Sequence, residues 1–246
     1  MALGVRRVGC AGWSIASQAA ALFPDPGSHL HRYARVFNTV EINSSFYRPH
    51  RPQTYARWAA SVPAAFRFSV KLPRSITHDQ RLLDVDALLA RFAGEAGALG
   101  DKLGCVLIQL PPSLAFQPAV AAPFAELIRT RLAEPLGCSL ALEARNAGWF
   151  DAAATELLQR HGIIRVIADP PVGQPGAHVP TTADIYLRMH GSPRRYYSTY
   201  SADYLLQLDA DMRAHAQAGR AVWCIFDNTL SPTYLQQALS VHRPLG

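Results

Sequence analysis

The feature of the sequence that most constrains its fold is a regular alternation of strand patterns with helix patterns. Short runs of apolar and β-branched residues recur along the chain, and stretches with apolar residues at helical spacing separate nearly all of them. Strands that alternate with helices pair in parallel, because each helix returns the chain to the same end of the sheet. We expect eight strands, at residues 8–13, 39–43, 67–71, 105–110, 139–145, 163–169, 185–190 and 221–228.

Eight strand–helix units in a chain of 246 residues favour one α/β domain, a TIM-like (β/α)8 barrel over residues 1–246. The alternation fails at residues 172–183, which are rich in Gly and Pro and show no helical period. We therefore expect an irregular barrel without a helix between its sixth and seventh strands. A doubly wound open sheet is the alternative, although no Gly-x-Gly-x-x-Gly follows the first strand. Ser28, Asp84 and Asp151 are expected to cap three of the helices.

The composition is that of an ordinary globular protein. Hydrophobic residues make up 49% of the chain and charged residues 17%, which is too apolar for a disordered chain. No apolar run approaches the roughly 18–20 residues of a membrane span, and residues 1–7 contain no apolar core of a signal peptide. The four cysteines lie far apart, without a Cys-x-x-Cys pair. They are expected to be buried reduced thiols in a cytoplasmic protein that has no membrane partner.

The net charge of +6 comes almost wholly from arginine, since Lys71 and Lys102 are the only lysines. Arginine forks bind phosphate and carboxylate groups well. An arginine-rich composition can also reflect the base composition of a genome, and net charge alone does not define a function. The partner expected from the charge is an anionic small molecule or a nucleic acid. The sequence leaves the oligomeric state open.

Polar side chains gather at the C-terminal ends of the expected strands. On the second, third and fifth strands, bulky apolar residues share one side of the pleat, and Glu41, Lys71 and Glu143 share the other. In a barrel that second side points inward, and the C-terminal ends form the active-site rim. Isolated buried charges are costly, so such groups pair with one another or bind something polar. The expected catalytic residues are Glu41, Lys71, Glu143, Asp169, His190 and Asp227.

Further polar and aromatic residues follow the same strand ends. The 191–200 loop carries two arginines and three tyrosines, a mix that suits a phosphate or an aromatic base, and long polar loops on this rim commonly carry function. An ordinary structural network, with Lys71 against Glu41 and Arg145 against Glu143, is the alternative. The expected ligand-binding residues are Trp13, Asn43, Tyr47, Arg48, His78, Gln109, Arg145, Trp149, Arg188, Arg194, Arg195, Tyr197, Tyr200 and Asn228.

Eight short strings, in order from residue 8 to about residue 240, together resemble the YecE-like family, also called domain of unknown function 72. They are GCAGW at 9–13, VEINSSFYR at 40–48, FSVK at 68–71, ITH at 76–78, QLPPS at 109–113, EAR at 143–145, LRMHG at 187–191 and FDNT at 226–229. The resemblance implies a TIM-barrel-like fold, similar to that of the metal-dependent apurinic endonuclease group. It implies no particular reaction.

The chain departs from a metal endonuclease in its supply of histidines. Such sites use many of them, whereas only His190 and His78 lie near expected strand ends here. Lys71, Arg145 and Arg188 would also crowd a metal with positive charge. A divalent metal remains a candidate cofactor, with Glu41, Glu143, Asp169, His190 and Asp227 as its candidate ligands.

The leading hypothesis is an enzyme of phosphoester-hydrolase type that acts on a phosphorylated or nucleic-acid ligand at the rim. Arginines and Lys71 would hold phosphate, and the carboxylates or His190 would transfer protons. A non-catalytic nucleotide or nucleic-acid binding protein is the first alternative. A glycoside hydrolase is the second, although the fourth and seventh strands end in Gln109 and His190 instead of glutamates.

Overall fold

The strands of the computed structural model all run parallel within the part of the chain that it describes, residues 3–231 and 233–242. They form two sheets, in the orders β2-β3-β4-β5-β6 and β1-β9-β8-β7. Their bounds are β1 Arg6–Cys10, β2 Thr39–Ile42, β3 Arg67–Lys71, β4 Leu103–Gln109, β5 Ser139–Glu143, β6 Ile163–Arg165, β7 Ile167–Asp169, β8 Ile185–Met189 and β9 Val222–Phe226.

The two sheets meet at two places, and neither is an ordinary ladder. The sixth expected strand is broken at Val166 into β6, which pairs with β5, and β7, which pairs with β8. Between β1 and β2, the described backbone pairing is reduced to a single bridge between Ala11 and Glu41. The strands therefore make a TIM-like ring that the backbone does not close, which confirms the expected irregular barrel.

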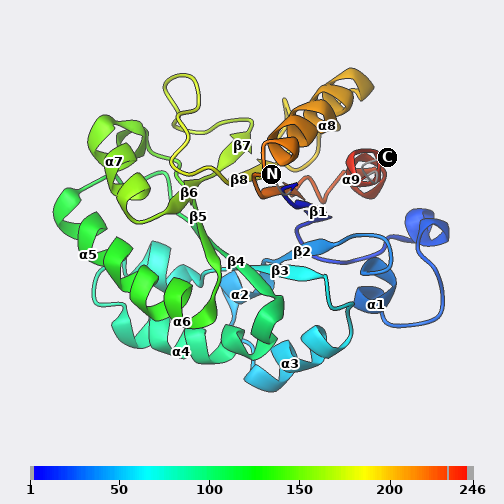
Figure 1. Ribbon diagram of the computed structural model, residues 1–246, viewed down its shortest axis with the longest axis horizontal. Coiled ribbons are helices and arrows are strands. Elements are labelled where there is room, and N and C mark those ends of the chain that lie inside the picture. The colour runs from blue at the N-terminus through cyan, green and yellow to red at the C-terminus, as the bar shows by residue number, and fades with distance from the viewer. Residues whose placement is uncertain (1–2, 232, 243–246) are drawn as a thin grey trace.

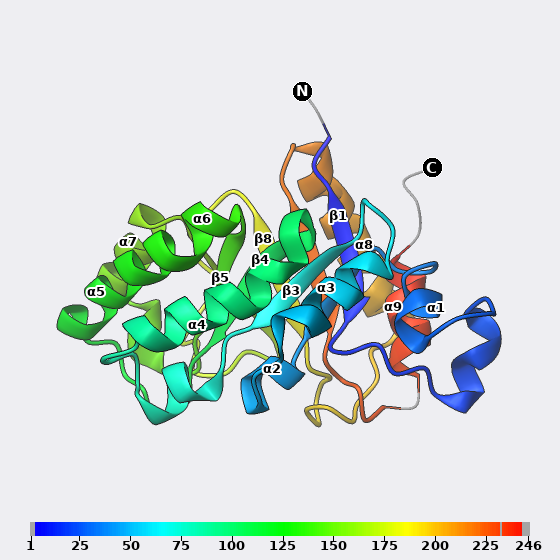
Figure 2. The same ribbon diagram turned by 90° about the horizontal axis from the view of Figure 1, so that it is seen from below.

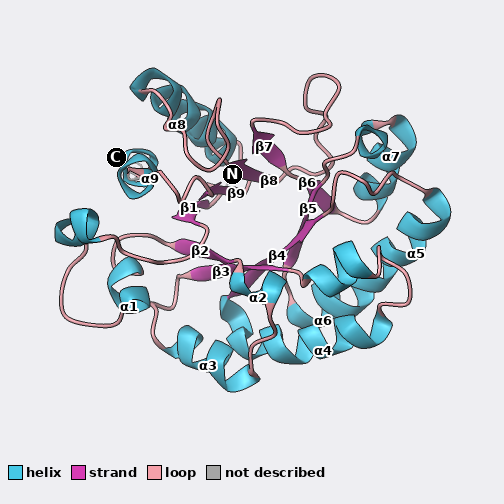
Figure 3. Ribbon diagram, turned by 180° about the vertical axis from the view of Figure 1, so that it is seen from behind, coloured by secondary structure: helices cyan, strands magenta, loops and turns pink. Residues whose placement is uncertain are grey.

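Helices surround the strands on nearly every side (Figure 1). Figure 3 shows one stretch, between α7 and α8, where only loop covers the sheet, as expected for residues 172–183. The helices are α1 His29–Tyr33, α2 Ser44–Tyr47, α3 Pro52–Ala60, α4 Asp86–Ala96, α5 Pro118–Ile128, α6 Glu134–Leu136, α7 Ala152–Arg160, α8 Ala202–Gln217 and α9 Tyr234–Val241. Shorter helical turns occupy Ser17–Leu22, Ser75–Asp79, Gly97–Lys102, Arg129–Ala133 and Ala147–Phe150.

Two of the three expected helix caps are present. The side chains of Ser28 and Asp151 accept hydrogen bonds from the first turns of α1 and α7. The Asp84 cap is wrong: α4 begins at Asp86, and Asp84 lies in a turn with a φ of 52°. Asp84 therefore lies outside the helical turn whose backbone N–H groups a cap would bind.

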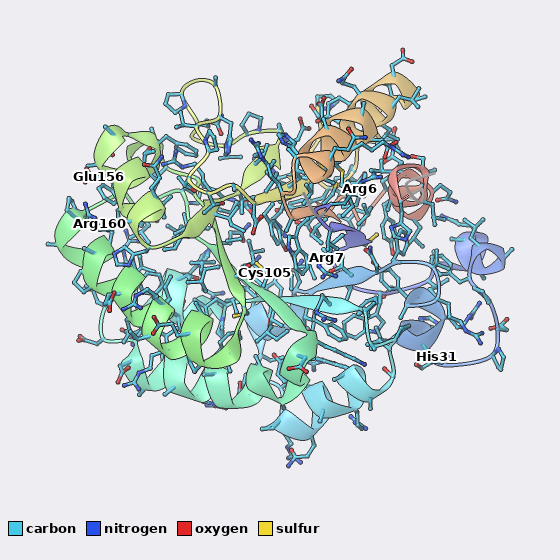
Figure 4. The ribbon with its side chains drawn as sticks, in the orientation of Figure 1. Arg6, Arg7, His31, Cys105, Glu156 and Arg160 are labelled. Carbon is cyan, nitrogen blue, oxygen red and sulfur yellow. The ribbon has the colours of Figure 1, made fainter. Side chains whose placement is uncertain are left out.

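The interior of the ring is apolar toward its N-terminal end. Tyr186 and Trp223 stack there with 5.9 Å between ring centroids, and the Arg7 guanidinium lies 5.3 Å from the Trp223 ring. A side chain at Gly104 would meet Trp223 at 2.7 Å, so glycine makes room for the indole. Figure 4 shows Cys105 among the strands, whereas Glu156 and Arg160 lie on the outer face of α7. The ring is thus filled at this end.

Arg165 anchors the loop that stands in for the missing helix. Its guanidinium donates to the carbonyls of Val179 and Trp149 and to the Thr155 hydroxyl, at 3.1, 3.0 and 2.8 Å. Thr181 Oγ1 also bridges the loop to β6, since it accepts from Arg165 N and donates to Ile163 O. Hydrogen bonds to the neighbouring strand and helix fix the loop in place of helix packing.

The four cysteines are buried and unpaired, as expected. Among the described residues, no helix combines the length and the apolar character needed to cross a bilayer. α2 and the gold loop after β8 lie at one end of the molecule (Figure 2), which is the end where the parallel strands finish. In TIM-like barrels the functional site lies at this end.

Candidate functional site

Arg188 is the centre of a buried cluster of charges at the C-terminal ends of the strands. Its side chain, inside the ring on β8, has no exposed surface. Nε and Nη2 donate to the two carboxylate oxygens of Glu41 at 3.1 and 2.7 Å. Nη1 donates to Glu143 Oε2 at 2.5 Å, and Nη2 also donates to Asp227 Oδ2 at 2.9 Å. One guanidinium therefore binds three carboxylates from three other strand ends.

Glu143, the last residue of β5, receives further donors on its second oxygen. Gln109 Nε2 and Arg145 Nε donate to Oε1 at 3.1 and 2.8 Å. Burial opposes the ionisation of Glu143, but Arg188, His190 and Arg145 outweigh it and hold the pKa well below its usual range. The carboxylate is therefore ionised at neutral pH although it is almost wholly buried.

His190 lies directly after β8, between two of these carboxylates. Its Nδ1 is 3.0 Å from Asp227 Oδ2 and its Nε2 is 3.3 Å from Glu143 Oε1. The second contact lacks hydrogen-bond geometry, so Nε2 is buried without a hydrogen-bond partner among the described residues. Burial lowers the pKa of His190, but Asp227 and Glu143 outweigh it and raise the pKa above the ordinary value. His190 is therefore buried and holds a proton more readily than a free histidine, and its Nε2 has an ion-pair contact with Glu143 but no hydrogen bond.

Lys71 differs from the other cations of the cluster because it has no carboxylate partner. It ends β3 and is 7% exposed, and the described ion pairs do not include it. Its Nζ lies 4.2 Å from the centroid of the Phe46 ring. Burial, followed by repulsion from Arg188, lowers the pKa of Lys71 to about 8 against the attraction of the three carboxylates. The Lys71–Glu41 pair of the structural-network alternative is absent, because Glu41 binds Arg188 instead.

A cavity of about 340 Å³ lies between α2, the Ser75–Asp79 turn and α4, and none of the charged residues of the cluster lines it. Phe46 lines this cavity and also carries Lys71 on its ring. The His78 ring meets Phe46 edge-on at 5.0 Å, and burial, followed by Lys71 and Arg74, lowers the pKa of His78. Tyr47 and Arg48 line the far side of the cavity and are exposed.

The 191–200 loop packs against the His190 side of the cluster. Tyr196 N donates to the His190 carbonyl at 2.5 Å, and the two rings meet edge-on at 5.7 Å. Asn228 Nδ2 donates to the carbonyl of Ser198 at 3.1 Å, which ties this loop to the end of β9. The Arg194 guanidinium lies 4.1 Å from the half-exposed Tyr197 ring. A role of this loop as a lid or recognition element stays a prediction.

The structure brings most of the expected polar residues together, and the role of each stays a prediction. Those in or beside the cluster are Glu41, Lys71, Gln109, Glu143, Arg145, Arg188, His190 and Asp227. Asn43 directly precedes α2, and its Oδ1 is buried without a hydrogen-bond partner among the described residues. Arg195 lies in the loop and has a buried Nε that is likewise unbonded.

Asp169 departs from the expected convergence. It pairs in register with Met189, so it has the opposite pleat phase to Arg188 and His190. Its Oδ2 accepts from the Tyr204 hydroxyl of α8 at 3.0 Å, outside the ring. The prediction that Asp169 joins the central pocket is therefore wrong in its geometry.

Several expected ligand-binding residues have structural contacts instead. Trp149 is buried, donates from its indole N–H to the Leu114 carbonyl at 3.0 Å and packs on Phe116, so its faces are not available for stacking. Trp13 packs edge-on against Trp58 at 5.1 Å. Tyr200 is buried, and its hydroxyl accepts from Gly191 N at 2.8 Å.

Sequence reasoning missed the polar layer beneath Arg188 and the rings beside it. The Tyr186 hydroxyl donates to Glu41 Oε2 at 2.8 Å and lies 2.7 Å from Ser69 Oγ. Both residues precede an inward-facing cation by two positions, so the pleat period could have found them. Phe46 and Tyr196 gave no such signal, because aromatic rings in loops commonly only pack.

The cluster does not fit a metal ion. Within the described ranges, no group of three or more His, Cys, Asp or Glu side chains is arranged to hold one. Glu41, Glu143 and Asp227 direct their oxygens at the Arg188 guanidinium, which takes the place that a metal cation would need. The positive charge that balances these carboxylates is supplied by the chain itself.

We predict that Glu41→Gln lowers the free energy of unfolding by about 3–5 kcal/mol, because it leaves a buried guanidinium partly unpaired. Glu156→Gln removes an equal charge from an exposed pair on α7 and should change stability by less than about 0.5 kcal/mol. Urea denaturation of both variants measures the difference. Equal small effects would mean that Arg188 is not held as described.

We predict the opposite sign for Lys71→Met, which should stabilise the protein by up to about 3 kcal/mol at pH 7. The folded state binds the Lys71 proton more weakly than the unfolded state, so the wild type carries the full cost below about pH 8. Between pH 8 and 10.5 the unfolded state binds more protons, so wild-type stability rises and the advantage of Met shrinks.

Denaturation curves at pH 7 and pH 10 check this prediction. Lys102→Met is the matched control, since Lys102 Nζ donates to the carbonyls of Ala59 and Val62 at 2.6 Å each and its loss should destabilise. A Lys71→Met protein that is less stable than the wild type at pH 7 would contradict the unpaired state of this lysine.

Comparison with known proteins finds relatives that match parts of the chain. The chain is 35% identical to the UPF0759 protein YecE of Escherichia coli K12 over 82 residues, which are 33% of this chain and 30% of that protein. It is 27% identical to the UPF0759 protein YunF of Bacillus subtilis 168 over 152 residues, 58% of this chain and 52% of that protein. The aligned segments thus span from about a third to about half of these relatives.

Solved structures share the fold over nearly the whole chain. A DUF72 family protein from Thermotoga maritima superposes with a TM-score of 0.79 at 24% identity, covering 96% of this chain and 97% of that one. Another from Enterococcus faecalis gives 0.78 at 20%, covering 96% and 94%. The family model described as "Protein of unknown function DUF72" matches residues 7–246. The chain therefore belongs to the DUF72 family, to which its YecE-like motifs and its unclosed TIM-like barrel both correspond.

Proposed function

We propose that this protein is an enzyme that acts on a phosphorylated ligand at the C-terminal ends of its strands. The observation that carries the proposal is an imbalance in how the charges at the rim are used. The carboxylates of Glu41, Glu143 and Asp227 all form ion pairs with Arg188. No described carboxylate forms an ion pair with Lys71, Arg194 or Arg195. An anionic ligand is the partner that these cations lack.

Unsatisfied polar atoms at the same end support a ligand. Asn43 Oδ1, His190 Nε2 and Arg195 Nε are buried and make no hydrogen bond in the described part of the chain. Buried polar atoms without partners cost about 1–3 kcal/mol each, so several at the same end of the barrel favour a polar molecule bound there. The cavity of about 340 Å³ between α2 and α4, at this end, has the size of a small-molecule site. A small phosphorylated molecule is therefore favoured over a nucleic-acid strand.

The acid–base group that the geometry favours is His190 with Asp227. The Nδ1–Asp227 contact holds the imidazole ring, and Nε2 makes no hydrogen bond in the described part of the chain. Because its pKa is raised, His190 is more protonated at neutral pH than a free histidine and is suited to protonate a leaving oxygen. Phosphoester hydrolysis would use a proton donor of this kind.

The glycoside hydrolase alternative finds no support in the cluster. Its two carboxylates would have to flank a sugar in an open cleft. Glu41 and Glu143 instead bind one buried guanidinium from two sides and are almost wholly buried. A non-catalytic binding protein would use the same cations, so turnover has to be measured to separate it from an enzyme.

We predict that replacing Arg194 and Arg195 with alanine weakens the binding of inorganic phosphate about tenfold and flattens its dependence on salt, because two rim cations are lost. Titration calorimetry at two salt concentrations measures both effects. Arg131 and Arg160, exposed and paired with Asp86 and Glu156, give a control with the same change in charge. Equal loss in both variants would assign the binding to net charge alone.

We predict that His190→Gln reduces turnover of a phosphoester at least a hundredfold, since a proton donor commonly contributes 10²–10⁴. Phosphate affinity should remain, because the rim arginines are intact. In the wild type, turnover should fall as pH rises through the raised pKa of His190. Phosphate release from a panel of sugar phosphates and nucleotides is the assay, and binding without turnover across the panel would favour the binding-protein alternative.

A further inference from the structure

The two lysines of the chain have opposite environments. Lys102 Nζ is held by two backbone carbonyls at 2.6 Å. Lys71 Nζ has no hydrogen-bond acceptor or ion-pair partner in the described structure, and it lies over the face of the Phe46 ring, 4.2 Å from the centroid. An amine that donates no hydrogen bond can turn its nitrogen toward an incoming atom, whereas one held by two carbonyls cannot.

The position of Lys71 suits covalent chemistry. Its 7% exposure leaves an opening for a small molecule and excludes most bulk water. The Phe46 ring that Lys71 contacts also lines the cavity of about 340 Å³ at this end of the barrel. Its pKa of about 8 leaves roughly a tenth of the amine neutral at pH 7, whereas an ordinary lysine is almost wholly protonated.

We propose that Lys71 is a nucleophile that forms an imine with the carbonyl carbon of a phosphorylated aldehyde or ketone. The inference deepens the proposed function and rests on it for the phosphate, which Arg194 and Arg195 would hold. It assigns a substrate class and gives Lys71 a covalent role, in place of that of a point charge.

The atoms and charges of this step balance without a further reactant. The neutral Nζ attacks the carbonyl carbon, the carbonyl electron pair moves to oxygen, and one proton passes from the nitrogen to that oxygen to give a neutral carbinolamine. The oxygen then takes up one further proton, the C–O bond breaks with departure of water, and the nitrogen lone pair forms the C=N bond of a protonated imine. His190 is the donor to the departing oxygen. It contacts Asp227 and Glu143, two carboxylates that also attract the Lys71 ammonium.

The residues around Lys71 face a single positive charge both before and after the reaction. The ammonium before the reaction and the protonated imine after it each carry one positive charge. The Phe46 face stabilises a cation in either form. The Arg188 cluster therefore meets the same charge at Lys71 before the reaction and after it.

Reductive trapping tests this proposal on the full chain. The protein is incubated with glyceraldehyde 3-phosphate or dihydroxyacetone phosphate and sodium cyanoborohydride, and peptide mass spectrometry locates the secondary amine. We expect saturable modification of Lys71 at least ten times faster than of Lys102, which serves as an internal control in the same molecule. Lys71→Arg, which keeps the charge, should abolish the fast modification and leave that of Lys102 unchanged.

The outcomes separate the two proposals. Modification of Lys71 at the rate of Lys102, in a protein that binds inorganic phosphate through Arg194 and Arg195, would overturn the imine and leave the proposed function standing. Fast modification of Lys71 that is equal for glyceraldehyde and its phosphate, without phosphate binding, would support the nucleophile and overturn the phosphorylated substrate. Fast modification that favours the phosphates and is lost in Lys71→Arg supports both.

Discussion

The structure depends on the neutralisation of one fully buried guanidinium. Arg188 lies on β8, but Glu41 and Glu143, two of its three carboxylate partners, belong to the other sheet. The backbone does not close the ring between β1 and β2, and the sixth strand is broken between β6 and β7. Ion pairs therefore cross-link the two sheets at the C-terminal end, where backbone pairing is incomplete. Because an unpaired buried charge is costly, the chemistry of the site and the integrity of the barrel are coupled.

The same cluster sets the protonation of the groups around it. Three carboxylates face two permanent cations, Arg188 and Arg145. The two titratable cations near these carboxylates are His190 and Lys71. The pKa of His190 is raised and the pKa of Lys71 is lowered. His190 touches two carboxylates and holds its proton, whereas Lys71 touches none and loses its proton more readily. An acid and an amine with a neutral fraction can thus coexist within one site at the same pH.

The sequence predicted the barrel and the inward direction of Glu41, Lys71 and Glu143, because strand alternation and the two-residue period are local properties. It could not predict the burial of Arg188, since a strand-end arginine suits an open rim equally well. The burial of Arg188 depends on carboxylates from three other strand ends, which only the folded barrel brings together. Asp169 was misplaced because its position at a strand end was weighed without its pleat phase. Trp149 was misplaced because packing and stacking tryptophans look alike in sequence.

The filled N-terminal end of the barrel limits how a ligand can enter and leave the site. Trp223, with Arg7 against its ring and Gly104 beneath it, blocks that end. A molecule bound above Arg188 therefore has one opening for both entry and exit. For the proposed enzyme, the product would leave through the same opening by which the next ligand enters, so its residence would limit the rate of turnover. Such an enzyme would show product inhibition that competes with the incoming ligand.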